Sequence, residues 1–153
     1  EDNRMDISTI KALLDACYQA KRIRELLPAL PNGVSSSHIQ YLDIIEQLEN
    51  RGMKVKISDI SDTLHLPRPG VTRTVKEMED KGFLKKTTSD EDGRITYLSI
   101  TEAGKKLSQT YNDRFFSQRA PLQTDISQEE ASCTIRTIEK LYQVMAERRI
   151  SLE

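Results

Sequence analysis

Apolar residues recur along this chain mainly at the three- and four-residue spacing of amphipathic helices. The first segment with this spacing covers residues 7–27, and its two apolar stripes indicate burial on more than one side. The following "LPALPNG" contains two prolines and a glycine, which end that helix. A second helix is expected between the serines at 35–37, which can cap its start, and Gly52, which fits its end.

A short helix, a tight turn and a longer helix follow. Residues 55–57 are too few for more than an edge strand, and Ser58 is expected to cap the short helix. The break at 66–67 leads into the longer helix, whose apolar residues fall at i, i+4 and i+7 and which ends at Gly82. Pro69 is tolerated near its start because the first-turn N–H groups have no intrahelical partner. This order is that of a helix-turn-helix.

Two strand-like segments come next, at residues 83–88 and 94–100, and Asp92-Gly93 between them is a strong turn signal. A helix-turn-helix followed by a β-hairpin makes a winged helix. The expected fold class is therefore mainly α with a small β-hairpin wing.

Two further helices are predicted after the hairpin, the first a long one capped by Thr101 and the last opened by a capping box at Ser127. A winged helix closes its own small core, so the apolar stripes of the first and last helices need another partner. A second copy of the chain is the expected partner. The predicted organisation is a winged helix-turn-helix domain at 35–100, with dimerisation helices at 1–34 and 101–153.

Composition narrows the class of protein. The chain has 153 residues, of which 37% are hydrophobic and 31% charged, which fits one soluble domain, or one such domain with an appended dimerisation element. No apolar run approaches the roughly 20 residues of a membrane span, and no signal-peptide pattern opens the chain, so a cytoplasmic location is expected. No nucleotide-binding glycine loop or nucleophile elbow is present, so neither an enzyme nor a cofactor is expected.

Charge is distributed unevenly along the chain. The net charge is only −1, but residues 66–86 hold six basic and three acidic side chains, a local net of +3. Such a run is the electrostatic footprint of nucleic-acid binding when it lies on one helix. Arginine can pair with guanine in the major groove, and threonine can contact phosphate or the thymine methyl. An ordinary surface helix is the alternative. The candidate DNA contacts here are Arg68, Pro69, Gly70, Thr72, Arg73 and Lys76.

The hairpin loop supplies one more candidate. Arg94 stands directly after the predicted turn, where it can enter the minor groove, and Asp92 can hold it in place. The alternative is a solvated acidic turn, because the neighbouring carboxylates of "SDEDG" would repel phosphate.

Three stretches in this order resemble the multiple-antibiotic-resistance regulator (MarR) family of bacterial winged-helix transcription factors: "VTRTVKEMEDKGFL", Asp92-x-Arg94 and "LSITEAG". The resemblance spans almost the whole chain. It implies a homodimer, joined through its N- and C-terminal helices, that binds palindromic duplex DNA. It also implies repression that is relieved when a small molecule, often aromatic or phenolic, occupies a pocket between the dimer helices and the winged helix.

The resemblance places the candidate residues of the longer helix at base- or phosphate-facing positions and Arg94 at the wing arginine. Family members often open that helix with small hydroxyl residues, where this chain has Pro67, Pro69 and Gly70, so its base preference is expected to differ.

The effector site is less defined in the sequence. Cys17 resembles the reactive cysteine of the family's organic-hydroperoxide sensors, but a buried structural cysteine fits its apolar stripe as well. The two histidines are too few for the family's zinc sites, and His38 is expected at the surface near a helix cap. No metal site is expected. The candidate ligand-binding residues are Leu14, Cys17, Tyr18, Tyr41 and Tyr111.

The sequence thus predicts a bacterial transcriptional regulator, a repressor, that binds palindromic duplex DNA as a homodimer and is released by a small-molecule effector. Two alternatives stay open: a winged helix used as a protein-interaction module, and a DNA-binding protein without a ligand.

Overall fold

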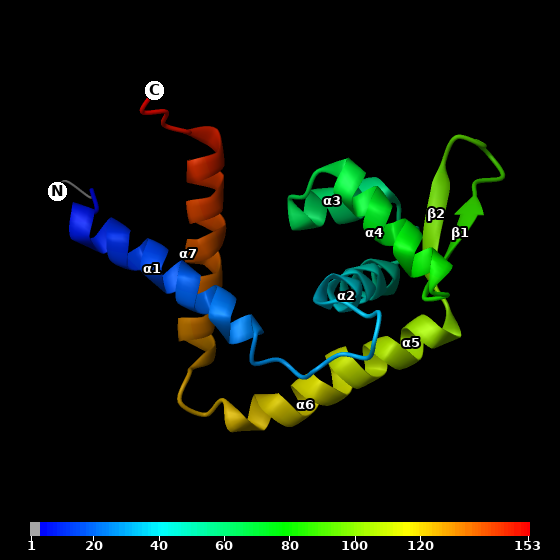
Figure 1. Cartoon of the computed structure of the whole chain (residues 1–153), viewed down its shortest axis with the longest axis horizontal. Helices are drawn as coiled ribbons and strands as arrows, with labels where there is room; N and C mark the ends of the chain where they lie inside the picture. Colours follow the sequence, from blue (N-terminus) through cyan, green and yellow to red (C-terminus); the bar gives the residue numbers. More distant parts are fainter. Residues whose placement is uncertain (1–3) are drawn as a thin grey trace. The chain divides into compact units, whose positions relative to one another are not determined.

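The computed structural model describes residues 4–153, which divide into two compact units, one up to Tyr111 and the other from Asn112 to Glu153. Figure 1 shows that helices dominate both units and that the strands form one hairpin. The elements of the first unit are α1 (Ile7–Arg24), α2 (Ser36–Asn50), α3 (Ile57–Leu64), α4 (Arg68–Asp80), β1 (Leu84–Thr88), β2 (Thr96–Ile100) and α5 (Glu102–Ser108). A π-helical segment (Gln109–Arg114) runs across the boundary, and α6 (Phe115–Arg119), a 3₁₀ turn (Ala120–Leu122) and α7 (Gln128–Glu147) follow.

The hydrophobic core lies inside the first unit, between α2, α3, α4 and the hairpin. The i, i+4 and i+7 positions of α4 point into this core, as their spacing predicts. Residues of α2 and α3 pack against them from the other side. The fully buried members of this core include Leu42, Ile45, Ile60, Val71, Val75 and Met78. The winged helix-turn-helix predicted from the sequence is confirmed.

The hairpin pairs β1 with β2 in antiparallel register, from Leu84 opposite Ile100 to Thr88 opposite Thr96. Val55 adds a single bridge, in which its carbonyl accepts a hydrogen bond of 2.8 Å from the N–H of Leu98. The short edge-strand segment expected at residues 55–57 is thus present as one bridged residue. It ties the loop before α3 to the hairpin.

The start of α3 differs from the prediction. Ser58 was expected as the N-cap, but the cap is Lys56, and the helix begins at Ile57. The carboxylate of Asp59 accepts the N–H of Lys56 at 2.8 Å, which satisfies that backbone donor before the helix begins. At the other end, His65 adopts φ 54° and ψ 41°, a left-handed conformation, and the Ser61 hydroxyl donates to the Leu66 carbonyl at 2.6 Å. These contacts form the tight turn into α4.

The predicted cap of α5 is confirmed. Thr101 accepts the N–H of Gly104 at 3.1 Å, and its own N–H donates to the carbonyl of Phe83 at 3.1 Å. Gly104 has no room for a side chain, because a Cβ there would lie 2.3 Å from that same carbonyl. The segment directly after α4 is therefore held against the start of α5.

The long helix expected from Thr101 towards Phe116 is helical but not uniform. It widens to a π-helical segment immediately after Ser108, whose buried hydroxyl donates to Glu46 of α2 at 3.0 Å. Helical periodicity does not reveal such a tertiary contact. Because α5 also packs on α2 and β2, its first part belongs with the winged-helix core. The assignment of residues 101–153 to dimerisation stays a prediction.

The first and last helices have no buried residue of their own. The predicted capping box of α7 is confirmed, because the Ser127 hydroxyl accepts the N–H of Glu130 and the Glu130 carboxylate accepts the N–H of Ser127. Its apolar stripe is open to solvent, with Ile135 58% and Ile138 42% exposed. None of the helices within residues 4–153 has the length and apolar character that crossing a bilayer requires.

Candidate nucleic-acid interface

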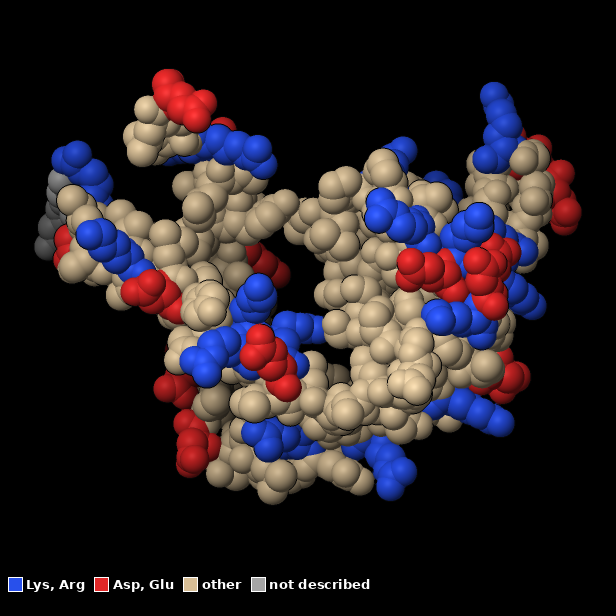
Figure 2. Space-filling model, viewed as in Figure 1, with Lys and Arg blue, Asp and Glu red and all other residues tan. Residues whose placement is uncertain are grey.

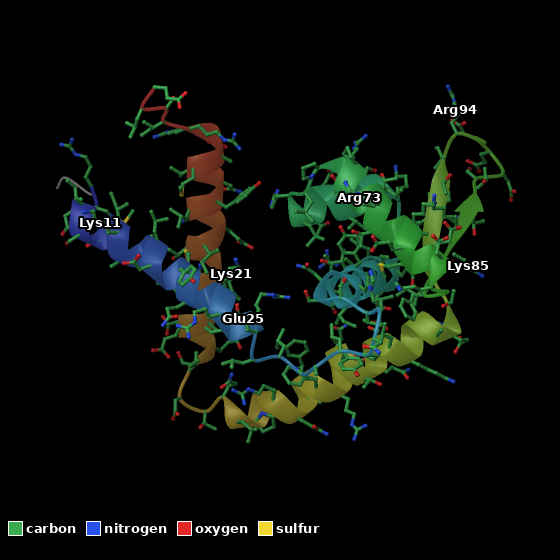
Figure 3. All side chains as sticks on the ribbon, viewed as in Figure 1. Lys11, Lys21, Glu25, Arg73, Lys85 and Arg94 are labelled. Carbon is green, nitrogen blue, oxygen red and sulfur yellow. The ribbon has the colours of Figure 1, made fainter. Side chains whose placement is uncertain are left out.

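The exposed face of α4 carries the basic residues singled out in the sequence. Pro67 precedes the helix as its N-cap and Pro69 lies in its first turn. The buried side of the helix is apolar, whereas the other side presents cationic and hydroxyl side chains to solvent. Figure 3 shows Arg73 on this helix. The candidate residues that α4 brings together as exposed positions are Arg68, Pro69, Gly70, Thr72, Arg73 and Lys76.

Basic and acidic groups are sorted along α4. Within residues 4–153, Arg68, Arg73 and Lys76 form no ion pair. In the C-terminal half of the helix, the Glu79 carboxylate instead lies 3.0 Å from the Lys86 amine. Glu77 lies 3.4 Å from the ring of His38. Arg68, Arg73 and Lys76 are thus left available to an outside anion, while Glu77 and Glu79 are engaged by the protein itself.

The wing loop presents Arg94 in a fixed geometry. Its side chain is 92% exposed, yet its Nε donates to Asp92 Oδ1 at 3.1 Å and one terminal nitrogen donates to Oδ2 at 3.3 Å. The backbone N–H of Arg94 donates to the same carboxylate at 3.0 Å. These hydrogen bonds from Arg94 hold the pKa of Asp92 below its ordinary value. The predicted contact between Asp92 and Arg94 is confirmed.

Further hydrogen bonds order the loop that carries this pair. The Ser89 hydroxyl accepts the backbone N–H groups of Glu91 and Asp92 at 3.2 and 3.3 Å. Figure 3 shows Arg94 at the end of the wing, extending beyond the ribbon. Because the loop is tied together by its own side chains, the guanidinium is oriented before any ligand arrives.

Two basic residues near the hairpin were not among the sequence candidates. Lys85 is exposed on β1, at the base of the wing (Figure 3), and Lys54 places its amine 5.4 Å from the centre of the Tyr97 ring. Figure 2 shows that basic side chains gather over α4 and the hairpin, with acidic ones between them. The Val55 bridge brings Lys54 beside the wing, and a three-residue strand signal does not predict that pairing.

His38 was expected at the surface near a cap, and half of this expectation is wrong. The ring does cap α2, because its Nδ1 accepts the backbone N–H of Ser35 at 3.1 Å. The side chain is only 3% exposed, however, and its ring centre lies 6.4 Å from that of Phe83. Packing against the segment after α4 buries it, and sequence spacing does not reveal that packing.

The five ligand candidates lie on three elements. Leu14 and Tyr18 are exposed on α1, where Cys17 is half-buried, and Tyr111 is half-buried in the π-helical segment. Tyr41 is buried in the hydrophobic core of the first unit, and packing accounts for its position there. The effector site stays a prediction. Within residues 4–153, no three His, Cys, Asp or Glu side chains cluster as metal ligands would.

Comparison with known proteins agrees with this geometry. Residues 32–95, from the loop before α2 to the wing loop, match the model of the MarR family. The helix-turn-helix-type transcriptional regulator YdgJ of Bacillus subtilis (strain 168), itself uncharacterised, is 24% identical over 112 residues. The match covers 71% of this chain and 64% of that protein, so the chain spans less than two thirds of the relative's length.

Solved structures share the fold. Streptococcus pneumoniae FabT in complex with DNA aligns with a TM-score of 0.65 at 20% identity, over 93% of this chain and 99% of FabT. The PcaV regulator of Streptomyces coelicolor, in complex with its natural ligand, aligns with a TM-score of 0.66 at 16% identity, over 92% and 96% of the two chains. The winged-helix segment of this chain is thus similar to the MarR family model, and the whole chain shares its fold with these solved regulators.

Proposed function

We propose that this protein binds duplex DNA through α4 and the wing, and that it regulates transcription as a homodimer. The observation that carries the proposal is the exposed face of α4, where Arg68, Arg73 and Lys76 form no ion pair within residues 4–153. A helix of this kind, entering the major groove by its N-terminal half, can pair its arginines with guanine. Arg94, held by Asp92, would then reach the adjacent minor groove.

The homodimer is proposed from the two terminal helices. Helix α7 keeps an apolar stripe exposed although it is twenty residues long, and α1 also exposes large apolar side chains. A second copy of the chain would cover these faces. Two symmetric α4 helices would enter successive major grooves about 34–36 Å apart, which requires a palindromic site. The protein would act in the cytoplasm, where bacterial DNA lies.

Repression released by a small molecule, an aromatic compound among the candidates, completes the proposal. PcaV, whose fold this chain shares, was solved with its natural ligand, and FabT was solved with DNA. The residues of this chain that would take part in effector binding remain Leu14, Cys17, Tyr18, Tyr41 and Tyr111. A DNA-binding protein without a ligand would bind the same site but would not be released by any effector.

The test is to select bound duplexes from a random DNA library at near-physiological salt. The same selection is run in parallel with the Arg73→Ala variant. The proposal predicts that the natural protein enriches a palindrome and that the variant does not. Affinity for the enriched duplex should fall steeply with salt, because Lys and Arg displace counterions from phosphates. A folded dimer that enriches no sequence would favour the protein-interaction module instead.

A further inference from the structure

We propose that His38 is a positioning residue for DNA recognition: it holds Glu77 away from Arg73 on α4. The inference rests on the DNA binding proposed above. His38 lies in the first turn of α2, outside the exposed face of α4, and none of the functional roles assigned so far involves it.

The hydrogen bonds of the ring define its protonation pattern. Nδ1 accepts the backbone N–H of Ser35 at 3.1 Å, so Nδ1 carries no proton. In the neutral ring the proton therefore lies on Nε2, which faces Oε2 of Glu77 at 3.4 Å. One buried side chain thus closes the cap of α2 with one nitrogen and engages α4 with the other.

Glu77 occupies a position where an unrestrained carboxylate would interfere with DNA binding. It lies four residues after Arg73, and side chains at this spacing are neighbours on a helix surface. Its side chain is 54% exposed, so it has room to turn towards Arg73 if His38 releases it. A pair between them would neutralise the guanidinium that is proposed to read a base. It would also place a carboxylate near the phosphates.

The other basic residue one turn from Glu77 is Lys81, and within residues 4–153 it forms no ion pair with Glu77. The Lys81 amine lies beside Gly33, at 3.0 Å from where a Cβ on that glycine would stand. Gly33, in the segment before α2, thus lies beside Lys81, the C-cap of α4, whereas His38, in the first turn of α2, contacts Glu77. Gly33 itself has φ 79°, a left-handed conformation that favours glycine.

A histidine at position 38 can both accept the cap N–H of α2 and donate to Glu77. In a capping box, the third helical residue is commonly Glu or Gln, which accepts the cap N–H through an oxygen. A glutamate at position 38 would accept that N–H but repel Glu77. Glutamine, like neutral histidine, offers both an acceptor and a donor. The conservative variant is therefore His38→Gln, and the disruptive one is His38→Ala.

The experiment compares four proteins on the selected duplex and on a random duplex: the natural chain, His38→Gln, His38→Ala, and His38→Ala combined with Glu77→Gln. We expect His38→Ala to weaken binding to the selected duplex about threefold to tenfold, between the effect of one exposed helix pair and that of a lost base contact. His38→Gln should stay within about twofold of the natural chain. Adding Glu77→Gln to His38→Ala should restore binding, because no charge is left to pair with Arg73.

Two results would overturn the inference while leaving the proposed function intact. One is that Glu77→Gln fails to restore binding, since loss of packing or of the cap alone would not be repaired by neutralising Glu77. The other needs no variant: nitrogen NMR shifts of the natural protein should show the proton of His38 on Nε2, and a proton on Nδ1 contradicts the geometry. If the natural chain itself selects no duplex, the proposed function fails and this inference fails with it.

Discussion

The winged helix and the terminal helices differ in where their apolar side chains lie. In the winged helix, α2, α3, α4 and the hairpin bury a common core, and several of its members are fully inaccessible to solvent. In α1 and α7 the apolar positions are equally regular in sequence, yet none of their residues is buried. Burial stabilises a fold in proportion to the apolar area removed from water, so a single chain gains this stabilisation mainly in the winged helix.

This difference suggests a division of roles: one chain alone forms the folded winged helix, whereas two chains are proposed to form the dimer interface. The winged helix has a core and an exposed basic face of its own, so it needs no partner to present α4. The terminal helices are regular and capped but expose their apolar stripes, which is the arrangement expected of a subunit interface. Folding and DNA contact would then depend on one region, and pairing of two recognition helices on the other.

The largest effect is expected in the core. Leu42→Ala removes a fully buried side chain of α2 and should lower the free energy of unfolding by about 2–5 kcal/mol, measured by urea denaturation. Leu152→Ala is the matched control, because that leucine is 98% exposed, and it should change stability by less than about 0.5 kcal/mol. Equal losses in the two variants would mean that the core is not where the structure places it.

A smaller effect is expected on dimer formation when a charged residue replaces an apolar residue in the exposed stripe of α7. Ile138→Asp should raise the dimer dissociation constant at least about tenfold, because a carboxylate would be buried in an apolar interface. Lys140→Asp is the control, since two residues along a helix lie on opposite sides. Sedimentation velocity measures both. A natural chain that is a well-folded monomer at micromolar concentration would contradict the dimer altogether.

The smallest expected effect is a change in the pKa of Asp92 when Arg94 in the wing loop is substituted. NMR titration should give Asp92 a pKa below its ordinary value, because the charged carboxylate accepts hydrogen bonds from Arg94. The pair therefore contributes to wing order above the ordinary pKa of an aspartate, and this contribution is lost as pH falls through the lowered value. Arg94→Ala should return the pKa of Asp92 towards its ordinary value. Arg94→Lys keeps the charge but not the two-pronged contact, so it should give an intermediate value.

The sequence was informative where local chemistry decides the structure. The serine cap of α2, the capping box at Ser127 and the cap at Thr101 depend on residues three apart, and all three are present. The apolar spacing of α4 and the turn signal of the hairpin likewise specify their own elements. The Asp92–Arg94 contact joins residues two apart, and it was predicted for the same reason.

The features that were missed depend on contacts between distant segments. Burial of His38 depends on Phe83 and α4, and the placement of Lys54 depends on a bridge between Val55 and the hairpin. The π-helical segment follows a serine that bonds to α2, sixty-two residues away in sequence. The start of α3 instead depends on a local contact, the hydrogen bond from the Lys56 N–H to the Asp59 carboxylate, which a serine cap at residue 58 does not predict.

The most direct test of the account compares the affinities of the natural protein and Arg73→Ala for the selected duplex and for a random duplex, at one salt concentration. If α4 reads bases, the natural protein prefers the selected duplex. The variant then loses about 1–3 kcal/mol on the selected duplex and far less on the random one. If the natural protein binds both duplexes equally, with or without Arg73, then α4 does not read DNA sequence and the account is contradicted.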